Sequence, residues 1–259
     1  MRSALATALG ALLAAVPALA DKKETRTPAP PLKLHMLSGS KEYKSEPSLK
    51  ALAAYLKKHY GIASTLSLGA DSVKEFPNLD AMDVADVLVV FCRRTKITGR
   101  QLERVRKWCK AGKPVVGIRT ASHAFQNWLA FDKEVLGGDY KGHGGGEKAV
   151  AVTLGSKAAG HPVLKGIEPW TRPGKLYRNP NLAADVTVLL NGKGAKDAQP
   201  LAWVRARKNG GRVFYTSMGG PADFQSEPFL RLLVNALHWT ARRTAPKFTK
   251  PDVPAKPGG

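Results

Sequence analysis

The sequence is poor in cysteine and acidic residues and has few long apolar runs, and these shortages exclude whole classes of protein. Two cysteines among 259 residues cannot staple a disulfide-rich scaffold. After residue 20 no stretch approaches the roughly 20 apolar residues that a membrane-spanning helix needs. Because 43% of the residues are hydrophobic and the glycines lack a period of three, disordered and collagen-like chains are also excluded. We therefore expect a packed globular protein, with one large domain or two small ones.

Acidic residues number 20 against 41 lysines and arginines, which gives a formal net charge of +21. Such a surface attracts polyanions, whether nucleic acid, acidic polysaccharide or anionic lipid. The chain has no recognised nucleic-acid motif and no basic stripe interleaved with aromatic residues. A nucleic-acid partner is therefore disfavoured.

The first twenty residues have the pattern of a signal peptide. Arg2 precedes the apolar run 4–16, and Ala18-Leu19-Ala20 offers small residues where a signal peptidase cuts. Cleavage after Ala20 would leave a secreted or periplasmic protein without a membrane span, and the alternative is an uncleaved N-terminal anchor. We expect a flexible leader at 21–32, one domain at 33–243 and a disordered, basic, proline-rich tail at 244–259.

Within 33–243, short aliphatic runs alternate with helical patterns. The first half alternates strand and helix, which predicts an α/β fold with a doubly wound, mostly parallel open sheet and helices on both faces, as in flavodoxin-like proteins. Strands are expected at 32–37, 62–68, 84–91, 114–118, 150–154, 186–190, 201–205 and 213–217, and helices at 48–60, 99–111 and 227–239.

Ligands of such sheets bind beyond the carboxyl ends of the strands. The segments that follow the predicted strands are 38–45, 92–96, 119–123 and 219–224. The candidate site residues are therefore sought there.

Several motifs at these segments resemble the ThuA-like (trehalose utilisation) family of the class I glutamine amidotransferase-like superfamily. The resemblance extends over about 34–242. Its motifs are Ser38-Gly39-Ser40-Lys41-Glu42-Tyr43, Gly117-Ile118-Arg119-Thr120-Ala121-Ser122-His123, Leu136-Gly137-Gly138-Asp139-Tyr140-Lys141-Gly142-His143, His161-Pro162, Pro200-Leu201-Ala202-Trp203 and 211–219.

The resemblance implies a protein that binds or processes a carbohydrate, and it leaves the reaction open. A glutamine amidotransferase needs a nucleophilic cysteine at the strand-to-helix turn. Here that position is Arg119, which cannot attack a carbonyl, so we expect no amidotransferase activity. Related chains often have Ser-Leu-Gly-His after the last strand, whereas this chain has Ser217-Met218-Gly219-Gly220.

Two residues are candidates for catalysis, His123 and Glu42. Imidazole titrates near neutrality, and Ser122 beside His123 could complete a proton-transfer pair. The alternative for Ser122 is a helix N-cap. Glu42 is the best-placed carboxylate for general-base work.

The candidate ligand-binding residues include three arginines, whose guanidinium groups suit carboxylate, sulfate or paired hydroxyls. Their alternative role is to pair with carboxylates such as Asp86 or Glu42. The full ligand-binding set is Arg93, Arg94, Arg119, Ser122, His143, Tyr177 and Asp223. For His143, which lies in the glycine-rich segment 137–146, the alternatives are a binding loop or lid and a flexible surface connection.

We predict no metal and no cofactor. Asp139, His143, His123 and His161 are ligand types, but no tight spacing unites them. For the cysteines we favour a buried Cys109 and a free or semi-exposed Cys92 over a disulfide. The leading hypothesis is a carbohydrate-binding or carbohydrate-processing protein, and the alternative is a non-catalytic module for acidic or sulfated glycan.

Overall fold

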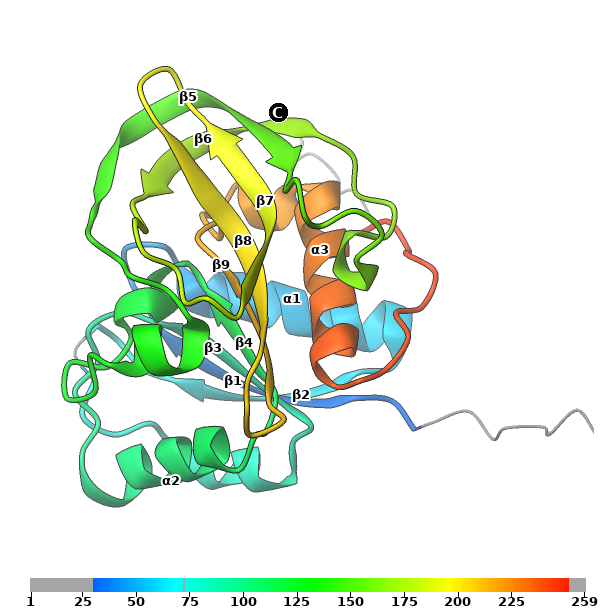
Figure 1. Cartoon of the computed structure of the whole chain (residues 1–259). Coiled ribbons are helices and arrows are strands. Elements are labelled where there is room, and N and C mark those ends of the chain that lie inside the picture. The colour runs from blue at the N-terminus through cyan, green and yellow to red at the C-terminus, as the bar shows by residue number, and fades with distance from the viewer. Residues whose placement is uncertain (1–29, 72, 252–259) are drawn as a thin grey trace, which may run out of the picture. The chain divides into compact units, whose positions relative to one another are not determined.

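The computed structural model describes residues 30–71 and 73–251 (Figure 1). The predicted signal peptide at 1–20, most of the leader at 21–32 and the last eight residues lie outside the described residues.

One mixed sheet organises the described part of the chain. Its nine strands lie in the order β2-β1-β3-β4-β9-β8-β7-β5-β6. They are β1 (Lys33–Gly39), β2 (Ala63–Leu68), β3 (Val87–Cys92), β4 (Val115–Ile118), β5 (His143–Leu154), β6 (Trp170–Tyr177), β7 (Val186–Lys193), β8 (Ala198–Ala206) and β9 (Arg212–Thr216).

The predicted α/β class is confirmed, but the sheet is only half parallel. The pairs β1–β2, β1–β3, β3–β4 and β4–β9 are parallel. The pairs β8–β9, β7–β8, β5–β7 and β5–β6 are antiparallel. For β7–β8 and β8–β9 the reason is the length of the connections, since residues 194–197 and 207–211 are too short to hold the crossover that a parallel pair requires.

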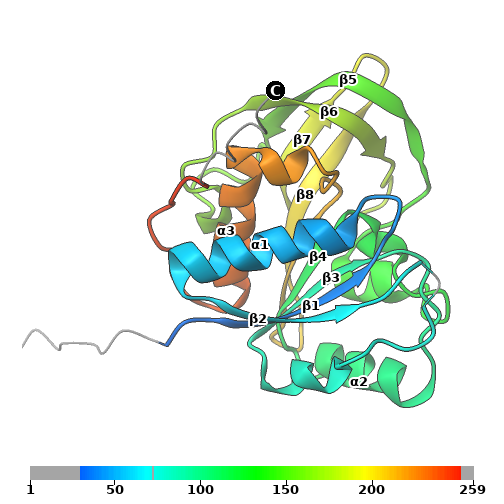
Figure 2. The ribbon, with the colours of Figure 1, turned by 180° about the vertical axis from the view of Figure 1, so that it is seen from behind.

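Helices cover both faces of the parallel half, as predicted. Helices α1 (Ser45–Tyr60) and α3 (Glu227–Thr240) lie on one face and α2 (Gly99–Lys110) on the other (Figures 1 and 2). The β3 side chains alternate between the two cores: Val87, Val89 and Phe91 join the α1/α3 side, and Leu88 and Val90 join the α2 side. A strand buried on both faces explains its uninterrupted apolar run.

Short helical turns link the longer elements. They are η1 (Leu79–Val84), η2 (Arg119–His123), η3 (Asp132–Leu136, a π-turn), η4 (Pro162–Leu164) and η5 (Asp223–Gln225). Among the residues that the structure describes, no helix is both long and apolar enough to cross a membrane.

Part of the expected tail packs against the domain. The Tyr55 hydroxyl donates to the Thr249 carbonyl at 2.5 Å, and the Thr249 N–H donates to the Tyr60 hydroxyl at 2.8 Å. The Arg231 guanidinium lies 4.4 Å from the centre of the Phe248 ring. The folded region therefore continues past the expected boundary at 243, because two aromatic residues of α1 and an arginine of α3 supply partners that composition does not reveal.

A histidine is buried where β1 pairs with β2. The ring of His35 contacts the Thr65 hydroxyl through Nδ1 at 2.8 Å and the Ser67 hydroxyl through Nε2 at 3.1 Å. Its side chain is fully buried, and this burial lowers the pKa of His35 to about 4, against the opposing influence of Asp80 and Asp83. The neutral ring is therefore part of the native sheet.

This burial predicts a pH-dependent stability. The folded-state pKa lies below the unfolded value of 6.5, so the contribution of His35 is complete above pH 6.5 and is lost as the pH falls towards 4. Between pH 7 and pH 4 the wild type should lose about 3 kcal/mol more unfolding free energy than His35→Gln. Urea unfolding of both proteins at pH 7, 5.5 and 4 measures this difference, and parallel losses would contradict it.

Candidate functional site

The carboxyl ends of β1, β3 and β4 bring the predicted site segments to one edge of the sheet. β1 pairs with β3 up to Gly39 and Cys92, and β4 follows as the next parallel strand. The turn η2 begins directly after β4, and its residue His123 accepts a hydrogen bond from the Arg94 N–H at 2.9 Å through its carbonyl. Parallel pairing therefore places Glu42, Arg93, Arg94 and Arg119 at the same edge.

Arg119 occupies a strained turn. Its φ of 48° is left-handed, a conformation that residues other than glycine rarely adopt. Gly219 lies against this turn, where a Cβ would come within 2.5 Å of Ile118, so only glycine fits there. The backbone thus makes a sharp turn after β4, and a side chain at its first position is directed into the site.

The guanidinium of Arg119 is held between two tyrosine rings. Its central carbon lies 3.9 Å from the centre of the Tyr43 ring and 5.1 Å from that of Tyr177. Nη1 donates to the Ser217 carbonyl at 3.0 Å, and the Tyr215 hydroxyl donates to the Arg119 carbonyl at 2.7 Å. The residue is only 3% exposed, so Arg119 orders the tyrosine rings around it and offers little surface to a ligand.

Stacked rings continue outward from this arginine. His123 stacks on Tyr140 with ring centres 4.6 Å apart, and Tyr140 lies 4.7 Å from Tyr177. His143 stacks on the same Tyr177 ring at 5.8 Å. We call these six residues the edge cluster: Tyr43, Arg119, His123, Tyr140, His143 and Tyr177.

His123 is neutral at physiological pH. Burial, together with the positive charges of Arg94 and Arg93, lowers its pKa to about 4, against an opposing effect of Glu42. Nδ1 lies 3.1 Å from the Ser122 hydroxyl. Ser122 lies inside η2 and its hydroxyl donates to the Arg119 carbonyl at 3.4 Å, so it is not the helix N-cap that one interpretation expected.

Glu42 and Arg93 form an ion pair beside the cluster. Nε of Arg93 lies 3.0 Å from Glu42 Oε2, and Nη1 lies 3.3 Å from Asp71 Oδ2. Burial raises the pKa of Glu42, but hydrogen bonding to Tyr43 and the charge of Arg93 lower it by more, so the carboxylate is ionised. Arg94 is exposed and forms no ion pair with the residues the structure describes. The three arginines therefore differ: one is buried, one is paired and one is available.

A buried carboxylate positions Tyr140. Asp132 of η3 accepts a hydrogen bond from the Tyr140 N–H at 2.9 Å. Asn179 likewise accepts from the Asp139 N–H at 3.1 Å. Burial raises the pKa of Asp132 to about 7. These contacts fix the first half of the glycine-rich segment, while its second half begins strand β5 at His143, so 143–146 is not an irregular loop.

Asp223 is engaged inside the protein. Its carboxylate accepts two hydrogen bonds from Arg172 of β6, at 2.6 and 2.7 Å, with both side chains about 95% buried. The same carboxylate accepts the Gly219 and Gly220 N–H groups at 2.8 Å each. The pair joins the antiparallel half of the sheet to the loop beneath Arg119, and this positioning contact competes with the ligand-binding role predicted for Asp223.

Within the described residues, no group of three or more histidine, cysteine, aspartate or glutamate side chains gathers as a metal site. His161 lies apart, with its ring 5.1 Å from that of Trp239.

Both cysteines are free and buried. Burial raises the pKa of the Cys109 thiol to about 12 and raises the pKa of the Cys92 thiol still more. Cys92 is thus fully buried and not semi-exposed, because it also faces the α2 core.

A cavity of about 520 Å³ opens at the carboxyl ends of β1 and β2. Its lining includes Ser40, Lys41 and Lys44 together with residues 68–70. The Ser40 hydroxyl is buried without a hydrogen-bond partner among the described residues.

Four contributors were not predicted as site residues. Tyr43 and Tyr140 lie inside the motifs quoted for the family resemblance, next to predicted residues. Asp71 follows β2, so the rule applied to the other strand ends would have found it. Arg172 has no such signal, because its partner Asp223 is 51 residues away.

The comparisons agree with this architecture. The sequence model of the ThuA family, described as trehalose utilisation, matches residues 33–240, and the chain belongs to this family. No curated protein matches the chain.

Two solved structures of ThuA-like proteins have the same fold. One, from Parabacteroides merdae, is 18% identical with a TM-score of 0.66, covering 85% of this chain and 94% of that one. Another, from Bacteroides uniformis, is 20% identical with a TM-score of 0.62, covering 83% and 93%.

The buried ion pair predicts a large stability effect. Arg172→Met leaves the Asp223 carboxylate buried without its partner, which should lower the unfolding free energy by about 3–5 kcal/mol. Lys148→Met, an exposed change on the adjacent strand β5, should alter it by less than about 0.5 kcal/mol. Chemical denaturation compares the two, and equal small effects would show that the pair contributes little.

Proposed function

We propose that the edge cluster binds a sugar or sugar derivative in a compartment outside the cytoplasm. The observation that carries the proposal is the half-buried stack of His123 on Tyr140, flanked by Glu42, Arg93 and the exposed Arg94. Aromatic faces offer apolar contact area, while carboxylate and guanidinium groups hydrogen-bond paired hydroxyls. The trehalose-utilisation family and the signal-like N-terminus support the same conclusion.

The arrangement supports sugar binding and argues against amidotransfer. His123 is neutral and can accept a hydrogen bond from a sugar hydroxyl, and the ionised Glu42 can accept another. Arg119 occupies the turn where an amidotransferase has its cysteine, and both cysteine thiols are buried with raised pKa values. The chain offers no activated thiol nucleophile at this turn.

A second candidate function is non-catalytic binding of acidic or sulfated glycan. The exposed Arg94, which has no carboxylate partner among the described residues, favours it. The two candidates agree on the place of binding and differ in whether the bound sugar is changed.

Calorimetry with trehalose, glucuronate and a sulfated disaccharide tests the proposal. We expect one of these sugars to bind, and His123→Ala to weaken that binding about tenfold or more, because the contact of the sugar with the half-buried ring is lost. His59→Ala, at the opposite end of α1, is the matched control and should bind like the wild type. Binding with turnover favours processing, and binding without turnover favours the module. If no sugar binds, or if both variants bind equally, the edge cluster is not the site.

A further inference from the structure

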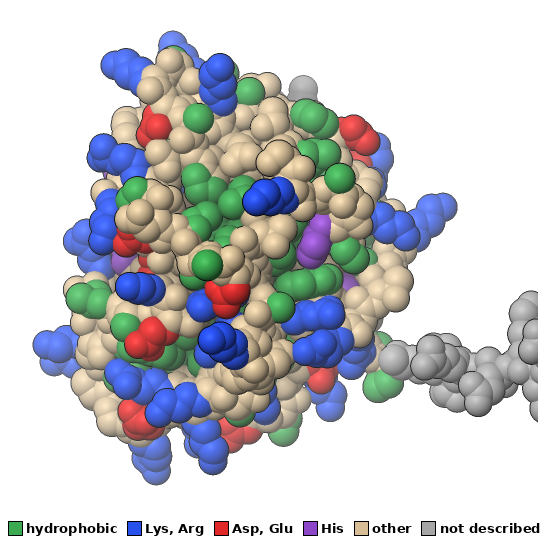
Figure 3. All heavy atoms as spheres, viewed as in Figure 1, with side chains coloured by type: hydrophobic (Ala, Val, Ile, Leu, Met, Phe, Trp, Pro, Cys, Tyr) green, Lys and Arg blue, Asp and Glu red, His purple; other side chains and the backbone are tan. Residues whose placement is uncertain are grey.

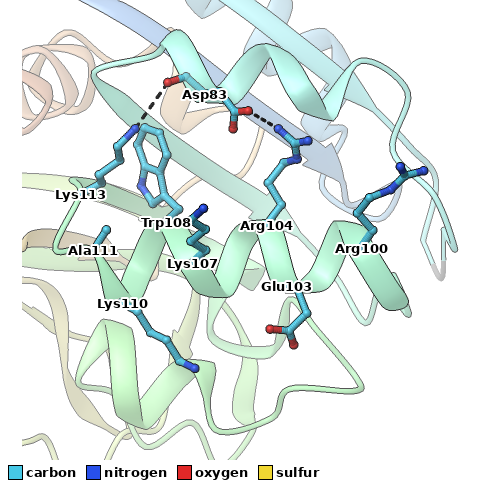
Figure 4. A pocket seen from close by; sticks show the side chains of 9 residues that line it. All are labelled: Asp83, Arg100, Glu103, Arg104, Lys107, Trp108, Lys110, Ala111 and Lys113. Carbon is cyan, nitrogen blue, oxygen red and sulfur yellow. Dashed lines mark hydrogen bonds and ion pairs between the residues drawn. The ribbon is translucent and has the colours of Figure 1, made fainter.

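A second hollow lies on the face of the sheet that α2 covers, between α2 and η1. It has a volume of about 790 Å³ and is separate from the edge cluster. Five cations and two carboxylates line it, a net charge of +3. We call it the α2 groove; Figure 4 shows its lining side chains, and Figure 3 shows lysine and arginine side chains crowding the surface over α2.

The carboxylates of the α2 groove are already neutralised. Asp83 pairs with Arg104 (Figure 4), and Glu103 lies 3.7 Å from Nε of Arg106. Arg100, Lys107 and Lys110 are exposed and form no ion pair among the described residues. The groove therefore keeps a row of unpaired positive charges along about 15 Å of helix.

The aromatic residue of the groove is covered. Trp108 is 4% exposed, its Nε1 donates to the Pro114 carbonyl at 3.0 Å, and the Lys113 ammonium lies 4.2 Å from the ring centre. The other apolar residues of α2 face the core. No open aromatic face is available for stacking a nucleic-acid base, and α2 has no apolar face to insert into a bilayer.

We propose that the α2 groove binds an anionic polysaccharide, sulfated or carboxylated, and so anchors the protein on a charged glycan. A row of exposed cations in a shallow hollow recognises repeated anionic groups along a chain, with an affinity that falls as salt rises. The groove is independent of the edge cluster, so either assignment can fail without the other.

Binding of heparin oligosaccharide and of polygalacturonate, measured at 50 and 200 mM salt, tests the proposal. At least one should bind, more weakly at higher salt, and the two polymers distinguish sulfate from carboxylate recognition. Lys107→Glu/Lys110→Glu should weaken binding on the order of tenfold or more. Lys57→Glu/Lys148→Glu makes the same change in net charge at exposed positions elsewhere and should weaken it far less.

Three results would overturn the proposal. These are equal weakening by both double variants, tighter binding of duplex DNA or of phosphatidylglycerol vesicles than of either polysaccharide, and no binding of either polysaccharide by the wild type. Thermal unfolding of both double variants checks that they fold. His123→Ala should retain polysaccharide binding, which separates this groove from the sugar site.

Discussion

The Arg119 guanidinium, held between Tyr43 and Tyr177, connects the ends of three strands at one edge of the sheet. Tyr43 follows β1, Arg119 follows β4, and Tyr177 ends β6 in the antiparallel half. Nη1 also reaches the Ser217 carbonyl after β9. Because stacking and charge act together in a dry environment, one side chain orders segments that are distant in the sequence. The half-buried rings of His123 and Tyr140 rest on this support.

The antiparallel half of the sheet has a structural role at the site. It supplies Tyr177 and His143 to the edge cluster and Arg172 to Asp223, which in turn holds the Gly219–Gly220 loop against the Arg119 turn. The strained φ of Arg119 persists because this surrounding structure determines it.

The sequence predicted the local elements better than their assembly. Apolar runs and helical spacing located β1 to β4 and the three long helices, and the strand-end rule brought together Glu42, Arg93, Arg94, Arg119 and His123. The antiparallel pairing of the second half was not predicted, and β6 was missed because Trp170–Tyr177 contains proline, glycine and charged residues. Asp223 was predicted to bind a ligand, since nothing near it in the sequence indicates that Arg172 is its partner.

The six histidines offer the most direct measurement of the central claim that a sugar binds at the edge cluster. His123 and His143 belong to the cluster, whereas His35, His59, His161 and His238 lie elsewhere. The sugar that binds in calorimetry is titrated into histidine-labelled protein, and the NMR signals of the imidazole rings are recorded. Saturable shifts should be confined to His123 and His143. Saturable shifts at His59 or His161, with His123 and His143 unchanged, would contradict the account.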